Sequence, residues 1–326
     1  MFKFNFNLET EEQNDSPAVA SESELNSQCW IPAQKHEVLP THLQSLSEDT
    51  VIEAVTIDQT EIKYLNMNSA VERLKKLRVS TNLSTALTDH SDLVPAVYEG
   101  GLKVWECTWD LLHYFAASGI KMKGCRVLEV GCGAALPALY AAIHGAHITL
   151  QDYNEEVINF ITIPNVILNI ANESSINNIN NATEYLTTSR DLVTDITSKA
   201  SFFSGDWGDF YKLLTKKQNS EQLTNDDQTS RNKDESQEYK FDIILTSETI
   251  YNPNCHEKLL NLMTNSLKQD GVILLAAKSH YFGVGGGTLQ FIDLVKCQDI
   301  LNIQTTVTNT EGVKREILEM KLKKLQ

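Results

Sequence analysis

A short glycine-rich segment contains the residues whose types and spacing best suit ligand chemistry. It reads Val-Leu-Glu-Val-Gly-Cys-Gly from Val127 to Gly133, and after a helical run a second strand, Ile148–Asp152, follows. Glycine at 131 and 133 allows the backbone to approach a ligand closely, because a Cβ atom there would collide with it. The acid that closes the second strand, Asp152, can accept hydrogen bonds from both hydroxyls of a ribose. The pattern predicts an open α/β sheet that binds a nucleoside-containing cofactor at the carboxyl ends of its strands.

The same residues discriminate between cofactors. A dinucleotide site has the pattern Gly-x-Gly-x-x-Gly, but Leu136 stands three positions after Gly133. Glu129 lies two residues before Gly131, and its carboxylate would repel a pyrophosphate. S-adenosylmethionine carries an ammonium, a sulfonium and a ribose but no phosphate, so the pattern favours it over NAD. The alternative is a glycine turn that binds no ligand, which leaves Glu129 and Asp152 unexplained.

A third strand ends in Gly205, Asp206 and Trp207. An acid at this position can accept from the amino group of adenine, and an indole can cover the face of the ring. The alternative is that Asp206 caps a helix while Trp207 belongs to the core. We prefer the ligand interpretation, because the site must lie at these strand ends.

The fourth strand gives way to a polar segment, Ser247–Pro253. Catalytic and substrate-orienting groups belong at this edge of such a sheet, which makes Glu248, Tyr251 and Asn252 candidates. The alternative is that Asn252 and Pro253 simply start the next helix.

Two further segments flank the predicted site. His280–Gly287 has four glycines in its last five positions, and because no Lys-Ser/Thr pair follows, it indicates a substrate-facing loop rather than a phosphate-binding one. A helix from position 104 carries Trp105 and Trp109 four residues apart, a spacing that usually marks core residues. The turn Tyr98–Gly101 before it has a hinge-like composition and could fold over the cofactor.

Strands and helices alternate from Gly124 onward, which predicts a Rossmann-like α/β fold with helices on both faces of the sheet. Five parallel strands and a carboxyl-terminal hairpin make seven strands, of which one is reversed. The strands are expected at Arg126–Val130, His147–Gln151, Ser201–Ser204, Phe241–Thr246, Val272–Ala277, Ile303–Asn309 and Glu316–Leu322. The helices are expected near Ala134–His144, Glu155–Asn169, Trp207–Leu214 and Asn254–Leu267.

Composition excludes several classes of function. The formal net charge of −15 disfavours nucleic acid as a direct ligand and favours a basic protein partner. Neither a membrane-spanning run nor a signal peptide is expected. The six cysteines lack metal-site spacing, so we expect reduced thiols and no bound metal. These cysteines are Cys29, Cys107, Cys125, Cys132, Cys255 and Cys297.

The chain divides into three predicted parts. Residues 1–49 are polar and acidic and are expected to be largely disordered, although alternating Phe2, Phe4 and Phe6 also suit a short edge strand. Residues 50–90 form a small lead-in with strands near Val51–Ile57 and Ile62–Leu65 and a helix near Ser69–Leu77. Residues 91–326 form the catalytic domain, with polar insertions near 172–199 and 216–240.

Several of these segments together resemble the eukaryotic histidine protein methyltransferases, a seven-strand family related to the small protein lysine methyltransferases. The resemblance covers about residues 90–326 and the Phe-Lys-Phe-Asn-Phe start. It is carried by Val97–Thr108, Gln151–Asn154, Phe202–Trp207, Leu245–Pro253 and His280–Gly287.

The resemblance implies methyl transfer from S-adenosylmethionine to a ring nitrogen of a histidine in a protein of the large ribosomal subunit. We also expect a monomeric enzyme that is located in the cytoplasm, with the nucleus as a second location. One departure is Ala135, where the family pattern often has glycine. The cofactor contacts implied by the resemblance are Trp105, Glu106, Cys107, Thr108, Trp109, Gly131, Asp152, Asn154, Gly205, Asp206, Trp207 and Ser247. Glu129 and Gly133 of the glycine segment are predicted contacts in addition.

A neutral imidazole suits this reaction, because its unprotonated nitrogen can attack the methyl carbon in line with the leaving sulfur. The protein must then select the tautomer and hold the geometry. We expect Glu248 to accept from the other ring nitrogen, and Tyr251 and Asn252 to position the ring. The alternatives are a lysine methyltransferase of the same fold and a non-catalytic ribosome-assembly factor or chaperone that keeps a vestigial cofactor site.

Overall fold

The computed structural model describes residues 30–43, 46, 50–76, 97–171, 192–221 and 239–324. The predicted strand at the Phe-rich start, most of the acidic segment and most of both insertions lie outside these ranges. Ile31–Gln326 form one compact unit, separate from Met1–Trp30. Within the described ranges, no helix has both the length and the apolar character needed to cross a bilayer.

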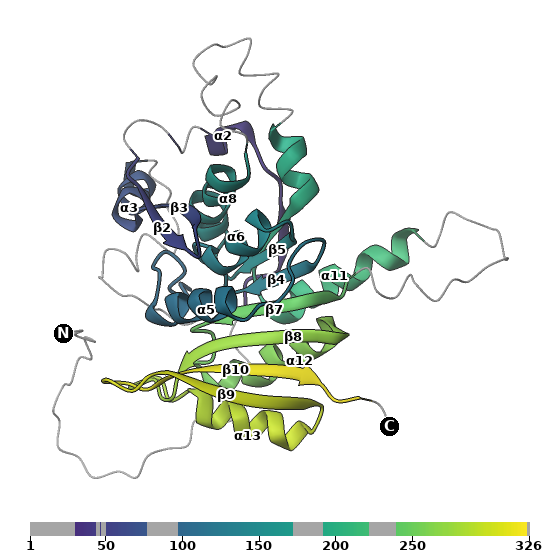
Figure 1. The fold of residues 1–326 in the computed structure, drawn as a ribbon. Coiled ribbons are helices and arrows are strands. Elements are labelled where there is room, and N and C mark those ends of the chain that lie inside the picture. Colours follow the sequence, from purple (N-terminus) through teal and green to yellow (C-terminus); the bar gives the residue numbers. More distant parts are fainter. Residues whose placement is uncertain are drawn as a thin grey trace, which may run out of the picture. The chain divides into compact units, whose positions relative to one another are not determined.

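An eight-stranded sheet forms the centre of this unit (Figure 1). Its order is β1-β6-β5-β4-β7-β8-β10-β9. The parallel strands are β4 (Arg126–Val130), β5 (His147–Asp152), β6 (Ala200–Ser204), β7 (Phe241–Ser247) and β8 (Leu267–Lys278). In the carboxyl-terminal hairpin, β10 (Arg315–Leu322) runs antiparallel to both β8 and β9 (Leu301–Asn309). The predicted seven strands with one reversed strand are thus confirmed.

The eighth strand corrects the sequence analysis. β1 (Gln34–His36) pairs antiparallel with β6, although its residues belong to the segment expected to be disordered. Its three residues are too few for a hydrophobic pattern to be visible, and its stability comes from pairing with a partner more than 160 positions away.

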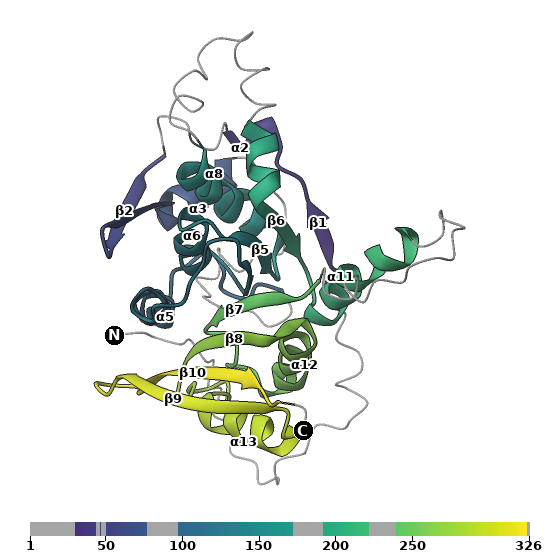
Figure 2. The same cartoon turned by 45° about the vertical axis from the view of Figure 1, so that its right-hand side comes forward.

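Helices cover both faces of the sheet, as predicted (Figure 2). One face carries α5 (Glu106–Ala117), α6 (Leu136–Ile143) and α8 (Ile163–Ile170), which pack with the side chains of Val127, Leu150 and Leu245. The other carries α11 (Trp207–Glu221), α12 (His256–Ser266) and α13 (Thr288–Gln298), which pack with Leu128 and Ile244. Neighbouring residues such as Val127 and Leu128 therefore enter opposite cores, because side chains alternate along a strand.

Two helices occur where the sequence analysis placed none. α13 was not predicted, and it follows the glycine-rich loop directly with Phe291 and Val295 buried. The predicted insertion near 172–199 extended too far, because residues 192–199 are helical and bury Leu192 and Ile196 in the core.

The stretch predicted as one helix over Glu155–Asn169 comprises three elements. α7 (Glu155–Val157) leads into a π-helical turn (Ile158–Thr162) and then α8. Pro164 lacks a backbone donor at this point, which favours the wider turn. The Oγ1 of Thr162 in that turn donates to the Gly133 carbonyl at 2.8 Å, so the irregularity holds the glycine turn in place.

The lead-in region forms the hairpin of β2 (Ile52–Ile57) and β3 (Thr60–Leu65), followed by α3 (Met67–Lys76). Two asparagines of α8 join the hairpin to the main fold. Asn165 Oδ1 accepts from the Leu65 N–H and Asn169 Oδ1 from the Lys63 N–H, each at 2.8 Å. α2 (Pro40–Leu43) completes the described elements before the hairpin.

Candidate active site

The carboxyl ends of the parallel strands meet where the strand order reverses. β4 has β5 on one side and β7 on the other, and the register pairs Val130 with both Gln151 and Thr246. Ligands of open α/β sheets bind outside such a switch point. The predicted residues at the ends of β4, β5, β6 and β7 are therefore brought to one edge of the sheet.

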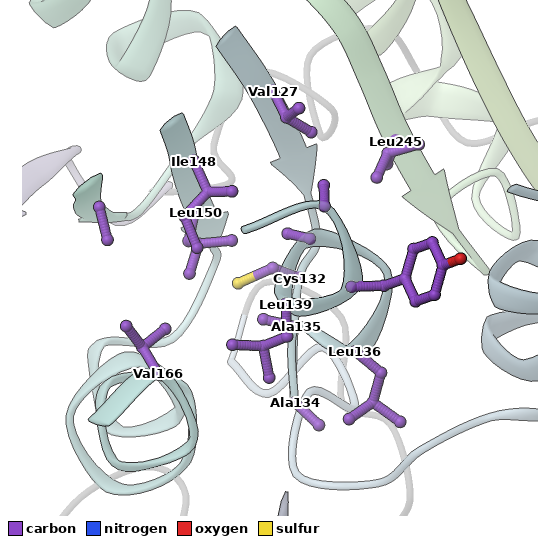
Figure 3. Packing of buried hydrophobic residues seen from close by; sticks show 14 of the residues in the cluster. Val127, Cys132, Ala134, Ala135, Leu136, Leu139, Ile148, Leu150, Val166 and Leu245 are labelled. Carbon is purple, nitrogen blue, oxygen red and sulfur yellow. The ribbon is translucent and has the colours of Figure 1, made fainter. Parts of the chain in front are cut away.

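Contacts within the protein explain in part why the turn after β4 has glycine at positions 131 and 133. Gly131 and Gly133 have positive φ angles of 63° and 48°. A Cβ atom at Gly131 would lie 2.6 Å from the Thr249 side chain, and one at Gly133 would lie 2.9 Å from the Gly101 carbonyl oxygen. These close neighbours are protein atoms, and the close approach of this backbone to a ligand stays a prediction. Figure 3 shows Cys132, Ala134 and Ala135 of this turn among the buried hydrophobic side chains of the core.

Ala135 takes the left-handed conformation that the family's glycine would adopt freely. Its φ is 61°, its side chain is fully buried, and it directly precedes α6. An alanine can adopt this conformation only at a cost in free energy, because its Cβ atom approaches the backbone. Ala135 thus has the backbone conformation that glycine would have at this position, and the turn keeps its shape.

Glu129 lies buried at the start of α6. Its Oε2 accepts from the Ala138 N–H at 2.9 Å. Burial raises the pKa of Glu129, the Ala138 hydrogen bond opposes this shift and the charge of Asp152 adds to it, and the resulting pKa is about 8. The carboxylate thus has an observed role at the helix start, and its contact with a cofactor ammonium stays a prediction.

This raised pKa predicts that Glu129→Gln increases the free energy of unfolding by an amount that depends on pH. The folded state holds the Glu129 proton more tightly than the unfolded chain, so the free energy of unfolding falls as pH rises from about 4.5 to about 8. An amide keeps the acceptor for Ala138 and removes the charge. The variant should be more stable than the parent at pH 8, by on the order of a few kcal/mol, and similar at pH 4. Urea denaturation across this range measures the difference, and an equal difference at both pH values would contradict the prediction.

Asp152 ends β5 with its carboxylate beneath the Gly101 backbone. Its Oδ2 accepts from the Gly133 N–H at 2.9 Å. A Cβ atom at Gly101 would lie 2.9 Å from Oδ1, so only glycine allows the turn to pass here. Burial raises the pKa of Asp152 to about 6, although backbone N–H groups of Gly133, Asn154 and Tyr153 act in the opposite direction.

Asn154 fixes the turn before α5. Its Nδ2 donates to the Val97 carbonyl at 2.8 Å, and its Oδ1 accepts from the Glu99 N–H at 3.1 Å. The Trp105 Nε1 closes the same turn by donating to the Gly100 carbonyl at 3.1 Å. The predicted cofactor residues Asn154 and Trp105 thus hold the turn against the glycine segment.

Gln151 is a central residue that the sequence analysis missed. Its buried Nε2 donates to the carbonyls of Asp152 and Gly205, each at 2.8 Å. Its Oε1 accepts from the Trp207 Nε1 at 3.0 Å and the Gly131 N–H at 3.4 Å. One amide therefore connects the ends of three strands. The available signal was a polar amide directly before the acid that ends the strand, next to the apolar residues Ile148 and Leu150.

Replacing Gln151 with Leu should destabilise the fold, because it leaves buried carbonyls and an indole N–H without their partner. We expect a loss of roughly 2–4 kcal/mol in the free energy of unfolding, measured by urea denaturation. Gln304→Leu on β9 is the matched control, because that side chain is exposed. Equal effects of the two substitutions would show that the Gln151 contacts do not hold the strand ends together.

The end of β6 shows the capping role that we had set aside. Asp206 Oδ1 accepts from the Gly208 N–H at 2.9 Å at the start of α11, and its Oδ2 forms an ion pair with Lys258 at 2.5 Å. Trp207 packs against the second core while its Nε1 bonds to Gln151. Both Asp206 oxygens thus have protein partners, and the contact with adenine stays a prediction.

The start of α5 meets the ends of β7 and β8. Thr108 Oγ1 and Ser247 Oγ are buried and 3.0 Å apart, and the Cys107 N–H donates to Glu248 Oε1 at 3.4 Å. Burial raises the pKa of the Cys107 thiol far above its usual range, so the thiol stays protonated. Trp109 faces elsewhere and packs edge-on against Tyr64 of β3. Trp109, one of the five predicted cofactor residues Trp105–Trp109, therefore contacts the lead-in hairpin, and its contact with the cofactor stays a prediction.

Glu248 is held by three donors at this junction. Its φ of 58° is unusual for a residue with a side chain, and the carboxylate is only 8% exposed. Tyr281 Oη donates to Oε2, and Lys278 Nζ lies 3.7 Å from Oε1. Lys278 also pairs with Glu106 at 3.1 Å. Burial lowers the pKa of Lys278, but the charges of Glu248 and Glu106 outweigh it and raise the pKa overall.

The glycine-rich loop lies against the segment after β7. The Gly286 N–H donates to the Tyr251 carbonyl at 2.9 Å, and a Cβ atom at Gly286 would lie 2.2 Å from the Ile250 oxygen. The rings of Tyr251 and Tyr281 meet edge-on, 6.3 Å apart. Asn252 Oδ1 accepts from the Asn254 N–H, which is the capping role given as the alternative. Phe282 at the tip of the loop is 67% exposed and lies edge-on to His280.

Comparisons with known proteins identify the family. Residues 103–197 match the family model described as "Tellurite resistance protein TehB". The chain is 36% identical over 324 residues to the histidine protein methyltransferase 1 homolog of Mus musculus, which covers 96% of this chain and 82% of that protein. It is 37% identical to the Bos taurus homolog, covering 90% of this chain and 74% of that protein. The chain belongs to the histidine protein methyltransferase 1 family.

Membership in the histidine protein methyltransferase family confirms the resemblance carried by the sequence motifs. It is also consistent with the arrangement at the switch point, where the predicted cofactor segment and the segment Glu248–Asn252 lie at the ends of neighbouring strands β4 and β7. Among the residues with described positions, no group of three or more histidine, cysteine or acidic side chains is arranged to hold a metal ion.

Proposed function

We propose that this histidine protein methyltransferase transfers a methyl group from S-adenosylmethionine to an imidazole nitrogen of a histidine in a basic protein of the large ribosomal subunit. The observation that carries the cofactor is the pair of buried carboxylates beside the glycine turn. In the described part of the chain, Glu129 and Asp152 accept hydrogen bonds from backbone N–H groups and from no basic side chain. Such a site suits a cationic ligand with hydroxyl groups and disfavours a phosphate.

The acceptor chemistry of Asp152 fits this cofactor. A carboxylate has about four acceptor positions, and those that the backbone leaves open can receive the ribose hydroxyls. Asp152, whose pKa of about 6 leaves it ionised at neutral pH, also places negative charge near the ligand's cationic groups. When bound, S-adenosylmethionine would supply an electrophilic methyl group.

The position of Glu248 supports a role on the acceptor side of the reaction. It lies at the end of β7, next to β4, and its carboxylate is fixed by Cys107, Tyr281 and Lys278. A fixed carboxylate can accept from the protonated ring nitrogen of the substrate and stabilise the imidazole as it becomes cationic. Tyr251 and Asn252 lie within four residues of Glu248 and would position the ring.

The proposal is tested by the chemical identity of the product. The protein is incubated with methyl-labelled S-adenosylmethionine and large-subunit ribosomal proteins, and the labelled protein is hydrolysed to amino acids. We expect methylhistidine. Methyllysine would instead support a lysine methyltransferase of this fold. Calorimetric cofactor binding without any labelled product would support a non-catalytic assembly factor or chaperone.

The pH dependence of the rate separates the two enzymatic alternatives. A neutral imidazole attacks, so the rate should rise with pH through the pKa of the substrate histidine, about 6.5 when unperturbed, and then level off. An amine would instead gain rate far into the alkaline range. Single-turnover rates between pH 5.5 and 9.5 with a saturating cofactor give the profile, and a continued rise above pH 8 would contradict histidine methylation.

The acidic charge of the chain supports a basic protein substrate. We further propose that the enzyme acts as a monomer in the cytoplasm, with the nucleus as a second location, and that residues 91–326 form its catalytic domain. Mass spectrometry of ribosomal proteins from cells with and without this protein would identify the modified histidine.

A further inference from the structure

The segment that contains the short strand β1 extends to the edge of the sheet where the cofactor is predicted to bind. We call Ile31–His36 the amino-terminal strap. Its residues Gln34, Lys35 and His36 pair with Ser204, Phe203 and Phe202 of β6, and the preceding residues continue past the end of that strand. The strap therefore runs from the outer edge of the sheet toward Gly205 and Asp206.

The strap contacts the strand ends at two backbone positions. The Asp206 N–H donates to the Ile31 carbonyl at 2.9 Å, and the Ile31 N–H donates to the Tyr153 hydroxyl at 3.1 Å. Tyr153 follows Asp152 directly, so the strap connects the residues predicted to contact adenine with those predicted to contact the ribose.

Gly205 shows how tight this contact is. A Cβ atom there would lie 2.5 Å from the Pro32 carbonyl oxygen and 2.6 Å from the Ala33 Cα. The Gly205 N–H also donates to the carbonyls of Asp152 and Tyr153, each at 3.0 Å. A glycine at the end of β6 is thus needed for the strap to lie against the strand ends.

Side chains anchor the other end of the strap. The His36 Nε2 and Ser204 Oγ are 2.8 Å apart, and Gln34 Nε2 donates to Glu155 at the start of α7. Lys35, between these two residues, is exposed. Val38, just after the strap, is 4% exposed and joins the main core.

We propose that the amino-terminal strap is a wall of the cofactor site at its adenosine end, so that cofactor affinity depends on residues outside the catalytic domain as drawn from the sequence. This inference rests on the proposed function, because it assumes that the ligand at this edge is S-adenosylmethionine. The reason is geometric. Displacing the strap would withdraw the hydrogen-bond partners of the Asp206 N–H and the Tyr153 hydroxyl at two neighbouring strand ends. A ligand that packs against Asp206 and Asp152 binds best when both are fixed.

The test uses the full-length chain with two substitutions that loosen opposite ends of the strap. Tyr153→Phe removes the acceptor for the Ile31 N–H, and His36→Ala removes the contact with Ser204. Each should weaken calorimetric binding of S-adenosylmethionine by about three- to tenfold, the range expected for one neutral hydrogen bond. Glu37→Ala, at an exposed position just after the strap, is the matched control and should leave the affinity unchanged. Circular dichroism at the titration temperature confirms that each variant is folded.

Hydrogen exchange supplies a second readout that does not depend on substitutions. Adding S-adenosylmethionine to the parent chain should slow amide exchange in Ile31–His36. Parent-like affinity in both loosened variants, or exchange in the strap that the cofactor leaves unchanged, would overturn the inference while leaving the proposed function intact. A parent chain that binds no S-adenosylmethionine would overturn the proposed cofactor, and the inference with it.

Discussion

Replacing Glu248 with Gln is expected to reduce the single-turnover rate of methyl transfer by about 100-fold, a loss similar to that seen when a catalytic site loses one group aimed at developing charge. The amide oxygen can still accept from the Cys107 N–H, but it cannot balance the positive charge that forms on the imidazole. Affinity for S-adenosylmethionine should stay within about twofold of the parent value, because a shape-conserving change removes no bond to the cofactor. Rapid-quench assays and calorimetry measure the two quantities separately.

Glu257→Gln is the control for this substitution, because it makes the same change on an exposed position of α12. A parent-like rate in Glu248→Gln would show that Glu248 serves only to hold the start of α5 to the loop after β8. The orienting group would then have to be Tyr251, Asn252 or a residue of His280–Gly287. A fall in both rate and melting temperature, with Tyr281→Phe giving the same pattern, would also indicate a structural role.

Replacing Asp152 with Ala should weaken binding of S-adenosylmethionine by about tenfold or more, since a hydrogen bond to a charged group contributes about 1.5–3 kcal/mol. The same carboxylate gives the affinity a pH dependence. Burial raises the pKa of Asp152 to about 6, so affinity should increase between pH 5 and pH 7 as the group ionises. In the alanine variant this increase should become smaller. Calorimetry at pH 5, 6 and 7 measures both effects.

Asp270→Ala removes an exposed acid from β8 and tests whether lost negative charge alone weakens binding. If Asp270→Ala and Asp152→Ala reduce affinity equally, long-range electrostatics rather than a ribose contact would explain the result. Unchanged affinity in Asp152→Ala would remove this residue from the cofactor site.

The sequence was sufficient for the elements that carry their own pattern. The strand Phe241–Ser247, for example, contains an apolar run, Ile243–Leu245, that ends in polar residues, and that change of character also predicts where the site lies. The parallel order then brings Gly131, Asp152, Gly205 and Ser247 to one edge without any knowledge of side-chain contacts. The fold and the position of the site therefore follow from local pattern and topology.

The roles of individual side chains did not follow, because their partners are distant in sequence. Asn154 bonds to Val97 and Glu99, and Asp206 pairs with Lys258, 52 residues away. Gln151 was missed for the same reason, since its four partners come from three strand ends. β1 and α13 were missed because one is too short for periodicity and the other is preceded by glycines that indicated only a loop.

The pairing of β1 with β6 also bears on which edge of the sheet is open to association with a second chain. An unpaired edge strand presents free backbone groups to which another chain can add. β1 covers the β6 edge with only three residues, one of them the exposed Lys35, so that edge is a poor template for a further strand. The opposite edge is β9, nine residues long and rich in threonine, with Val307 45% exposed. Strand-to-strand association of two copies would therefore begin at β9. Three strands, β7, β8 and β10, separate β9 from β4 and the glycine turn that follows it.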